Sequence, residues 1–372
     1  MTRSKYLSYR NELIDNCLNL KFKHNENLYG QFNMVSAGLT NYLSSINFKH
    51  HEDIYRKILL HKKLSILEQS CEPALQFLEV ENLDNQTLKY LQINPAIICT
   101  FHTGSYRLIN LLLVKYKIPF SLVISRNVIE KEREGFSNLY NDLSDRAELS
   151  NFALIDAEAT NAGFQMLRSL KEKKTLLFYI DGNSGSGSMN VDNSNCCLIT
   201  FLEQRLFVRK GISFLANKAS VPIIPVASYR TSWENIHLKF FDSIPPCKKN
   251  VSNPENTTQE IYNLVSPLVA KFPEQWEAWL YLHKFANIKI DECNKEVGHC
   301  KSGRLVFNPS CFGVLKINNI PYLFNKKCYV FYKITDSVFE FLNECSLTPV
   351  KNGRVSSLLI KEFLNKKVLL SV

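Results

Sequence analysis

The feature that most constrains the fold is an alternation of short apolar runs with helix-like segments between Pro95 and about residue 271. The apolar runs are AIICTF, FSLVI, FALID, TLLFYI and VPIIPVASY. Short, continuously apolar runs are typical of parallel strands that are covered on both faces. The segments between them place apolar residues at helical spacing. This order predicts an α/β fold, a mostly parallel sheet covered by helices.

The alternation of apolar runs with helix-like segments is absent before and after this region. We therefore expect the chain to have four parts. These are an N-terminal helical segment (1–92), the α/β domain (93–287), a polar linker (288–302) and a small C-terminal α+β module that resembles a winged helix (303–372). Two helices, in TTQEIYNLVSPLVAKF and EQWEAWLYLHKF, are expected to close the α/β domain. We expect His50, His51 and His61 of the first part to be solvated or to cap helices.

Composition favours a globular chain, since 45% of the residues are hydrophobic and 12% are aromatic. The net charge is +10, and residues 288–372 hold 13 Lys and Arg against 7 Asp and Glu. This excess suggests an acidic partner: an anionic membrane face, an acidic carrier protein, an acidic peptide or nucleic acid. A basic surface that serves solubility alone is the alternative. No nucleic-acid-binding motif is present, so a nucleic-acid partner is not expected.

The eleven cysteines are scattered without a disulfide framework, which fits a reducing cytoplasm. Cys293, His299 and Cys300 are close in sequence but lack the paired spacing of zinc sites, so no metal is expected. No apolar run approaches the roughly 20 residues that span a bilayer. We therefore expect a cytoplasmic protein, with the option of peripheral contact at the inner face of the cytoplasmic membrane.

His102 stands at the end of the first apolar run, and Gly104 and Ser105 follow it in FHTGSYR. Ligands of open α/β sheets bind at the edge where the carboxyl ends of the strands lie. A histidine at that edge can act as a general base near neutral pH. The alternative is a turn histidine that satisfies local hydrogen bonds.

Two more places have residues suited to a site. Asp181 ends the run TLLFYI, either as a site carboxylate or as a turn residue. Arg209, Lys210 and Gly211 precede a helix, and a helix start with flanking cations suits a phosphate or an oxyanion; a solvated helix start is the alternative. The Gly182–Ser188 loop lacks the ending of a nucleotide-binding P-loop, and we interpret it as a mobile flap.

Four stretches between residues 95 and 285 carry a family resemblance. They are FHTGSYRL, LLFYIDGNSG, FVRKGISFLANKASVPIIPVASYR and FPEQWEAWLYLHKF. In this order they resemble the glycerolipid (lysophospholipid) acyltransferase superfamily, and the last stretch resembles the closing signature of the lipid A late acyltransferases. The resemblance implies transfer of a fatty acyl group from an acyl carrier protein or coenzyme A thioester to a hydroxyl, without a cofactor. We expect no N-terminal membrane helix of the kind that many members have, which is a departure from the family.

The resemblance also implies roles for residues. His102 matches the general base, and Glu274, Gln275 and Trp276 match a signature with a structural role beside the site. The region of Arg209 is expected to line the cleft and to contact an acceptor phosphate or the phosphopantetheine of the donor. The candidate substrate-binding residues are Gly104, Ser105, Arg107, Arg209, Lys210 and Gly211.

Position 107 departs from the family, which has an Asp or Glu there to orient the histidine. Arg107 cannot accept the imidazole N–H, and its charge would disfavour an imidazolium nearby. Either Asp181 supplies the carboxylate, or the acceptor is an amine that needs less base assistance, or catalysis is lost and the chain binds a lipid or a peptide. Our primary prediction is an acyltransferase with His102 and Asp181 as catalytic residues.

The stretches IPYLFNKKCYVFYKITDSVFEFLNEC and LLIKEFLNKKVLL resemble the PqqD-like modules that bind leader peptides in peptide-modifying systems. In those modules the peptide adds a strand to an exposed sheet edge. The resemblance implies that the acceptor could be a precursor peptide, while the first resemblance favours a lipid. A scaffolding role for this module is the alternative.

Overall fold

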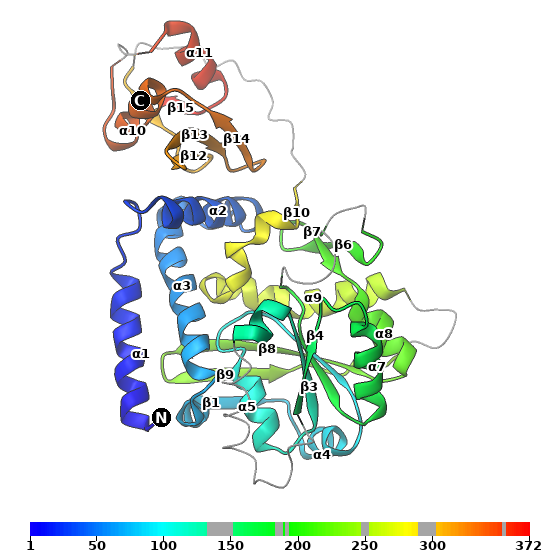
Figure 1. The fold of residues 1–372 in the computed structure, drawn as a ribbon. Coiled ribbons are helices and arrows are strands. Elements are labelled where there is room, and N and C mark those ends of the chain that lie inside the picture. Colours follow the sequence, from blue (N-terminus) through cyan, green and yellow to red (C-terminus); the bar gives the residue numbers. More distant parts are fainter. Residues whose placement is uncertain (132–151, 183–188, 190–192, 247–252, 289–302, 352–354) are drawn as a thin grey trace. The chain divides into compact units, whose positions relative to one another are not determined.

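The computed structural model describes residues 1–131, 152–182, 189, 193–246, 253–288, 303–351 and 355–372 (Figure 1). The chain divides into two compact units. The first contains residues 1–19, 56–201 and 206–278, and the second contains residues 20–55, 202–205 and 279–372. The expected N-terminal part, 1–92, is therefore shared between the units.

A seven-stranded sheet with the order β1-β9-β8-β2-β5-β3-β4 forms the centre of the first unit. Strands β2, β3, β4, β5 and β8 run parallel, whereas β9 is antiparallel to β8 and parallel to β1. The strands are β1 (Leu78–Glu81), β2 (Ile97–Thr100), β3 (Phe120–Ile124), β4 (Phe152–Asp156), β5 (Thr175–Tyr179), β8 (Ile223–Ser232) and β9 (Asn235–Phe240). The expected mostly parallel α/β sheet is confirmed.

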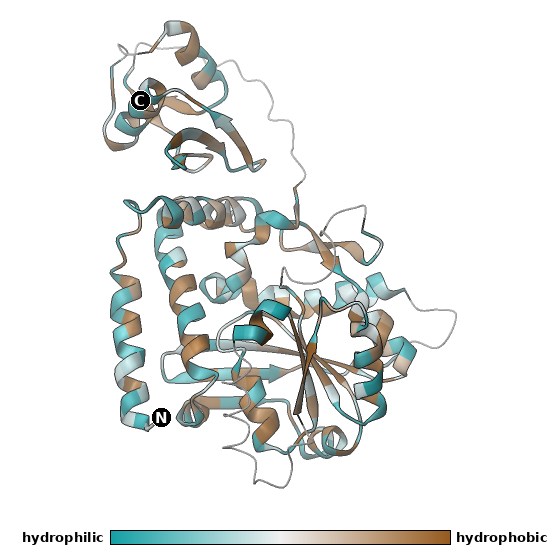
Figure 2. Cartoon of the chain, viewed as in Figure 1, coloured by the Kyte–Doolittle hydropathy of each residue, from teal (hydrophilic) through white to brown (hydrophobic). Residues whose placement is uncertain are grey.

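The first unit also contains helices, several of which pack against this sheet (Figure 1). They are α1 (Arg3–Leu18), α4 (Asn85–Ile93), α5 (Leu108–Lys115), α7 (Ala162–Lys171), α8 (Gly211–Ala219) and α9 (Pro254–Lys271), with most of α3 (His51–Glu68). Strands β6 (Cys196–Phe201) and β7 (Gln204–Arg209) are neighbours in a smaller sheet. The central strands are strongly apolar, whereas the helices alternate polar and apolar residues (Figure 2). This is the pattern of a sheet buried under amphipathic helices.

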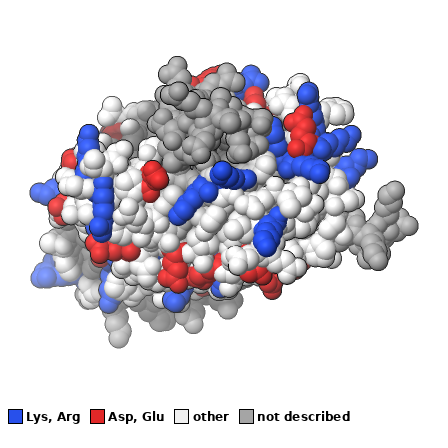
Figure 3. Space-filling model, turned by 90° about the horizontal axis from the view of Figure 1, so that it is seen from below, with Lys and Arg blue, Asp and Glu red and all other residues white. Residues whose placement is uncertain are grey.

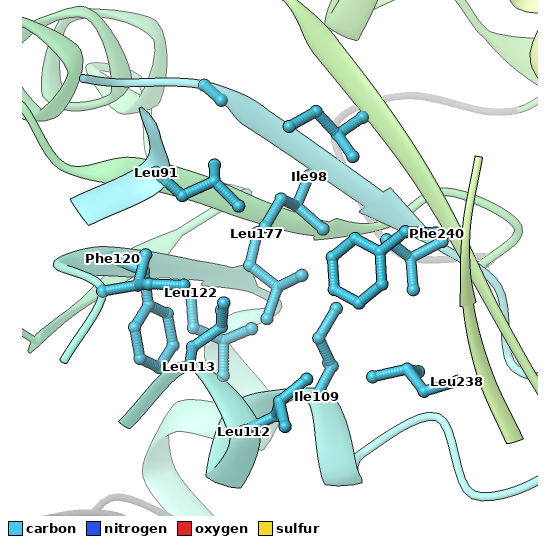
Figure 4. Close-up of a cluster of buried hydrophobic side chains, with 14 of the residues drawn as sticks. Leu91, Ile98, Ile109, Leu112, Leu113, Phe120, Leu122, Leu177, Leu238 and Phe240 are labelled. Atoms are coloured by element: carbon cyan, nitrogen blue, oxygen red, sulfur yellow. The ribbon is translucent and has the colours of Figure 1, made fainter. Parts of the chain in front are cut away.

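A cluster of buried side chains joins α5 to the sheet (Figure 4). Ile109 and Leu113 of α5 meet Ile98 of β2 and Leu177 of β5 in this cluster, and each of the four is fully buried. Burying one such side chain contributes about 1.5–3 kcal/mol. The cluster therefore fixes the relative positions of β2 and β5, the two strands that lead into the candidate site.

Three sequence-based expectations were wrong. Strand β1 lies inside the segment that was expected to be helical throughout. The stretch EQWEAWLYLHKF forms the short 3₁₀ turns η4 (Pro273–Gln275), η5 (Glu277–Leu280) and η6 (Leu282–Lys284), because Trp276 has an extended backbone that bridges to Thr103. His61 is buried inside α3, neither solvated nor at a helix end, whereas His51 is buried at the start of that helix, where it caps the short turn Phe48–His50.

The second unit combines helices with two small antiparallel sheets. Helix α2 (Glu26–Tyr42) packs against β12 (Phe312–Ile317). The other elements are β10 (Ala286–Asn287), β11 (Leu305–Phe307), β13 (Ile320–Asn325), β14 (Val330–Lys333), α10 (Asp336–Leu347), α11 (Ser357–Asn365) and β15 (Leu369–Ser371). Asn318 and Asn319 turn the β12–β13 hairpin with positive φ angles of 51° and 65°, which asparagine tolerates better than most residues.

Charged side chains of both signs occur on the face drawn in Figure 3. Lys and Arg lie there singly or in small groups, and Asp and Glu gather along one edge. In the part of the chain that the structure describes, no helix is both long enough and apolar enough to cross a membrane.

Candidate active site

The candidate site is built on the neighbouring parallel strands β2 and β5. His102 lies two residues beyond the end of β2, and Asp181 lies two residues beyond the end of β5. His102 Nδ1 lies 2.6 Å from Asp181 Oδ1, and the backbone N–H of His102 is 3.0 Å from both carboxylate oxygens. The structure thus places the carboxylate that the sequence suggested beside the imidazole, although the two residues are far apart in the chain.

This geometry sets the tautomer of the histidine. A carboxylate accepts a hydrogen bond, so Nδ1 carries the proton and the neutral ring has its lone pair on Nε2. The side chain of His102 is 17% exposed, whereas that of Asp181 is 1% exposed. Gly182 lies beside the ring, since a Cβ placed on it would be 3.4 Å from His102 Cε1. A partly accessible imidazole with a buried carboxylate behind it is the arrangement of a general base.

Trp276 orients the carboxylate from the other side. Its indole Nε1–H donates to Asp181 Oδ2 at 2.7 Å, and the side chain is fully buried. Both carboxylate oxygens of Asp181 are therefore engaged, one by the histidine and one by the tryptophan. The sequence suggested a structural role for this tryptophan but not this hydrogen bond, because an indole in a core and an indole bound to a carboxylate look alike in a sequence.

The segment around Trp276 holds the loop that carries His102. The backbone N–H of Glu277 donates to the carbonyl of His102 at 2.8 Å, and the N–H of Gly104 donates to the carbonyl of Gln275 at 3.0 Å. The side-chain amide of Gln275 also bonds the backbone N–H and carbonyl of Arg230 in β8, at 2.7 and 2.8 Å. These bonds fix the loop against the sheet.

Gly104 and Ser105 lie where the loop meets β8. Gly104 has a φ of +54°, and a Cβ on it would be 2.9 Å from Tyr229 Cα, so only glycine fits without strain. Ser105 is buried; its N–H donates to Ser228 Oγ at 3.1 Å, and its hydroxyl accepts from Arg230 at 2.6 Å. These contacts are with protein groups and support the loop, while the expected contact of both residues with substrate stays a prediction.

Arg107 belongs to a neighbouring polar cluster. Its guanidinium donates to Gln69 Oε1 at 2.6 Å and to the Tyr106 hydroxyl at 3.1 Å. The Tyr106 hydroxyl in turn donates to Glu277 Oε2 at 3.2 Å, and Lys62 pairs with the other oxygen of Glu277 at 3.0 Å. Arg107 is therefore fixed by these groups, and the carboxylate beside His102 is that of Asp181, just beyond the end of β5, instead of one at position 107.

Two tyrosines pack their rings against His102, with ring centroids 4.8 Å away for Tyr106 and 5.3 Å away for Tyr179. Burial raises the pKa of Tyr179 to about 12. Burial also raises the pKa of Tyr106 well above its ordinary value; Arg107 opposes this shift and Glu277 adds to it. Both phenols therefore stay protonated at neutral pH and act as hydrogen-bond donors.

A buried ion pair lies behind the loop, and no sequence pattern indicated it. Arg230 of β8 donates to Glu68 Oε1 of α3, and both side chains are at most 2% exposed. The Tyr6 hydroxyl donates to the same oxygen at 2.9 Å. Because Arg230 also binds Ser105, the pair connects α1 and α3 to the base of the site.

Arg209 ends β7, Lys210 caps α8 and Gly211 begins it, as the sequence predicted. Lys210 Nζ pairs with Glu255 of α9 at 3.0 Å. The structure thus places these three residues at a helix start, and their predicted contact with a phosphate stays untested. Of the expected flap only Gly182 is described, and Cys293, His299 and Cys300 lie outside the described residues.

Within the described ranges, no three His, Cys, Asp or Glu side chains are grouped as metal ligands would be. No model of a known protein family matches the chain, and no curated protein matches it in sequence. The residues that bear on function are therefore His102, Asp181 and Trp276, with the groups that hold them.

Proposed function

We propose that the protein is an acyltransferase that moves a fatty acyl group from a thioester of acyl carrier protein or coenzyme A to a lipid or peptide acceptor. The observation that carries this proposal is the 2.6 Å contact between His102 Nδ1 and Asp181 Oδ1. The order of the sequence motifs around the site, which resembles that of the glycerolipid acyltransferases, supports the choice of reaction.

In the proposed reaction, His102 Nε2 takes the proton from the acceptor hydroxyl or amine as its oxygen or nitrogen attacks the thioester carbonyl. A new carbon–oxygen or carbon–nitrogen bond forms and the carbon–sulfur bond breaks. The proton then passes from the imidazolium to the leaving thiolate, so the histidine returns to its neutral form. Asp181 stabilises the transient imidazolium, and Trp276 holds Asp181 in place.

The departure at position 107 is compatible with this proposal. The carboxylate of Asp181, which follows β5, can replace the family's carboxylate, because the imidazole requires only an acceptor for the proton on Nδ1. Arg107 is occupied by Gln69 and Tyr106. The carboxylate of Glu277 lies near the guanidinium and offsets part of its charge. The alternative that catalysis has been lost has no such geometric support.

The test incubates the purified full chain with one of two donors, long-chain acyl-coenzyme A or acyl carrier protein loaded with a long-chain acyl group. It measures the free thiol that is released from the donor. Acceptors are offered as two panels, lysophospholipids and synthetic peptides, and products are identified by a mass increase of one acyl group. We expect His102→Ala to abolish transfer and Asp181→Asn to lower kcat by about a thousandfold or more, since a misoriented imidazole is a poor base.

His50→Ala is the matched control, because His50 is exposed. It should transfer acyl groups at the wild-type rate. Mass spectrometry of lipid and peptide extracts from a host that expresses the wild type or His102→Ala extends the search to acceptors outside the panels. Acyl products formed equally by wild type and His102→Ala would refute the proposed role of His102.

A further inference from the structure

Two phenylalanine side chains of the first unit are largely exposed to solvent. Phe164 of α7 is 79% exposed and Phe214 of α8 is 63% exposed, and they are the two most exposed aromatic side chains among the described residues. Helices α7 and α8 pack against each other, and Figure 1 shows them side by side. Exposed large apolar side chains that gather on one surface mark a site of interaction.

Both phenylalanines lie at the edge of the sheet that carries the candidate site. Helix α7 begins six residues after Asp156, the last residue of β4, so its first turn lies at the carboxyl edge of the parallel strands. Helix α8 ends shortly before β8 begins at the opposite edge, so its own first turn also lies at the carboxyl edge. His102 and Asp181 extend from that same edge.

Basic side chains follow each phenylalanine along the same exposed face of its helix. In α7, Phe164, Arg168 and Lys171 are spaced i, i+4 and i+7, and all three are exposed. In α8, Phe214 and Lys218 are spaced i and i+4, and both are exposed. Each helix therefore presents an aromatic group near its start and a cation one turn further on.

The segments that form and flank these two helices are strongly basic. Residues 161–174 and 206–219 together hold seven Lys and Arg and a single acid, Glu172. Glu172 pairs with Arg168 on the surface, and Lys210 pairs with Glu255 of α9. Exposed ion pairs of this kind are weak and can exchange for a stronger anion.

We propose that the face formed by α7 and α8 docks on the surface of an anionic phospholipid bilayer, with Phe164 and Phe214 inserted among the lipids. Aromatic rings enter the interface of a bilayer, while Lys and Arg reach back to phosphates. The two phenylalanines favour a bilayer over an acidic carrier protein, since charge alone would serve the carrier. The link to catalysis rests on the proposed function: docking turns the edge that bears His102 towards a lipid acceptor.

The test is flotation of the full chain with vesicles of phosphatidylcholine alone and of phosphatidylcholine with an equal amount of phosphatidylglycerol. We expect the wild type to float with the anionic vesicles and to bind neutral ones much more weakly. Phe164→Ser with Phe214→Ser should lower the partition coefficient at least about tenfold, the effect of withdrawing buried aromatic surface. Arg168→Gln with Lys171→Gln should weaken binding and reduce its dependence on salt.

The control replaces two leucines of the second unit that are at least as exposed as the phenylalanines, Leu347→Ser and Leu358→Ser, whose exposures are 84% and 79%. This control should bind as the wild type does. Equal binding by the phenylalanine variant and the wild type would overturn the proposal. So would binding of acidic acyl carrier protein through this face without any binding to vesicles. His102→Ala should still bind vesicles, so a failure of the proposed reaction is distinguishable from a failure of docking.

Discussion

Lys326 gives the sharpest test of how the second unit is held together. Its side chain is 1% exposed, and Nζ donates to Ser36 Oγ and to the carbonyl of Pro309, each at 2.8 Å. The ammonium also lies 4.6 Å from the centroid of the Phe48 ring. Among the described residues no carboxylate pairs with Lys326, so burial lowers its pKa to about 7.

The sign of the pH dependence follows from this shift. An unfolded chain keeps the pKa of lysine near 10.4, so between pH 7 and 10 the unfolded state binds more protons than the folded state. Stability therefore rises with pH over this window. With a folded pKa of about 7, the rise from pH 7 to pH 9 is about 2 kcal/mol. Burial also lowers the pKa of His51, to about 4, so its contribution has the same sign but lies between about pH 4 and 6.5.

The perturbation is Lys326→Met, which keeps an apolar chain of similar length and removes the titrating group. Urea unfolding, followed at pH 7, 8 and 9, should show that the variant lacks about 2 kcal/mol of the rise seen in the wild type. Lys327→Met is the matched control, because Lys327 is the next residue and is exposed. Parallel stability curves for wild type and Lys326→Met would refute the reasoning. If Lys326→Met does not fold, an NMR titration of the lysine side chains in the wild-type protein measures the pKa of Lys326 directly.

Three further changes test the candidate site. Gly104→Ala should destabilise the first unit by about 2 kcal/mol or more, because its φ of +54° and the nearby Tyr229 backbone leave no room for a Cβ; an unchanged urea midpoint contradicts this. Trp276→Phe keeps the ring but loses the donor to Asp181, so kcat of acyl transfer should fall about tenfold to a hundredfold with an unchanged circular dichroism spectrum; wild-type turnover would remove the positioning role. Glu68→Gln leaves the buried charge of Arg230 uncompensated and should cost about 3 kcal/mol, seen as a lower Tm; a Tm equal to that of wild type would show that the pair is dispensable.

The sequence predicted the parts of the fold that are encoded by periodicity. The runs from AIICTF to VPIIPVASY became β2, β3, β4, β5 and β8 of a parallel sheet, because continuous apolar character identifies a strand buried on both faces. Periodicity failed at EQWEAWLYLHKF, which has apolar residues at helical spacing. There the bonds of Glu277 and Gln275 to the loop of His102 replace helical hydrogen bonds.

By itself the sequence determined the α/β class, the position of His102 at the end of a strand and the absence of an acid at position 107. Only the tertiary structure decided which carboxylate stands beside the imidazole, because the order of strands in the sheet, with β2 next to β5, brings residues 79 positions apart within 2.6 Å. The tertiary structure also decided that Lys326 is buried while Lys327 is exposed. Local patterns record which face of an element is apolar, whereas the partner of a polar group depends on what the fold packs against it.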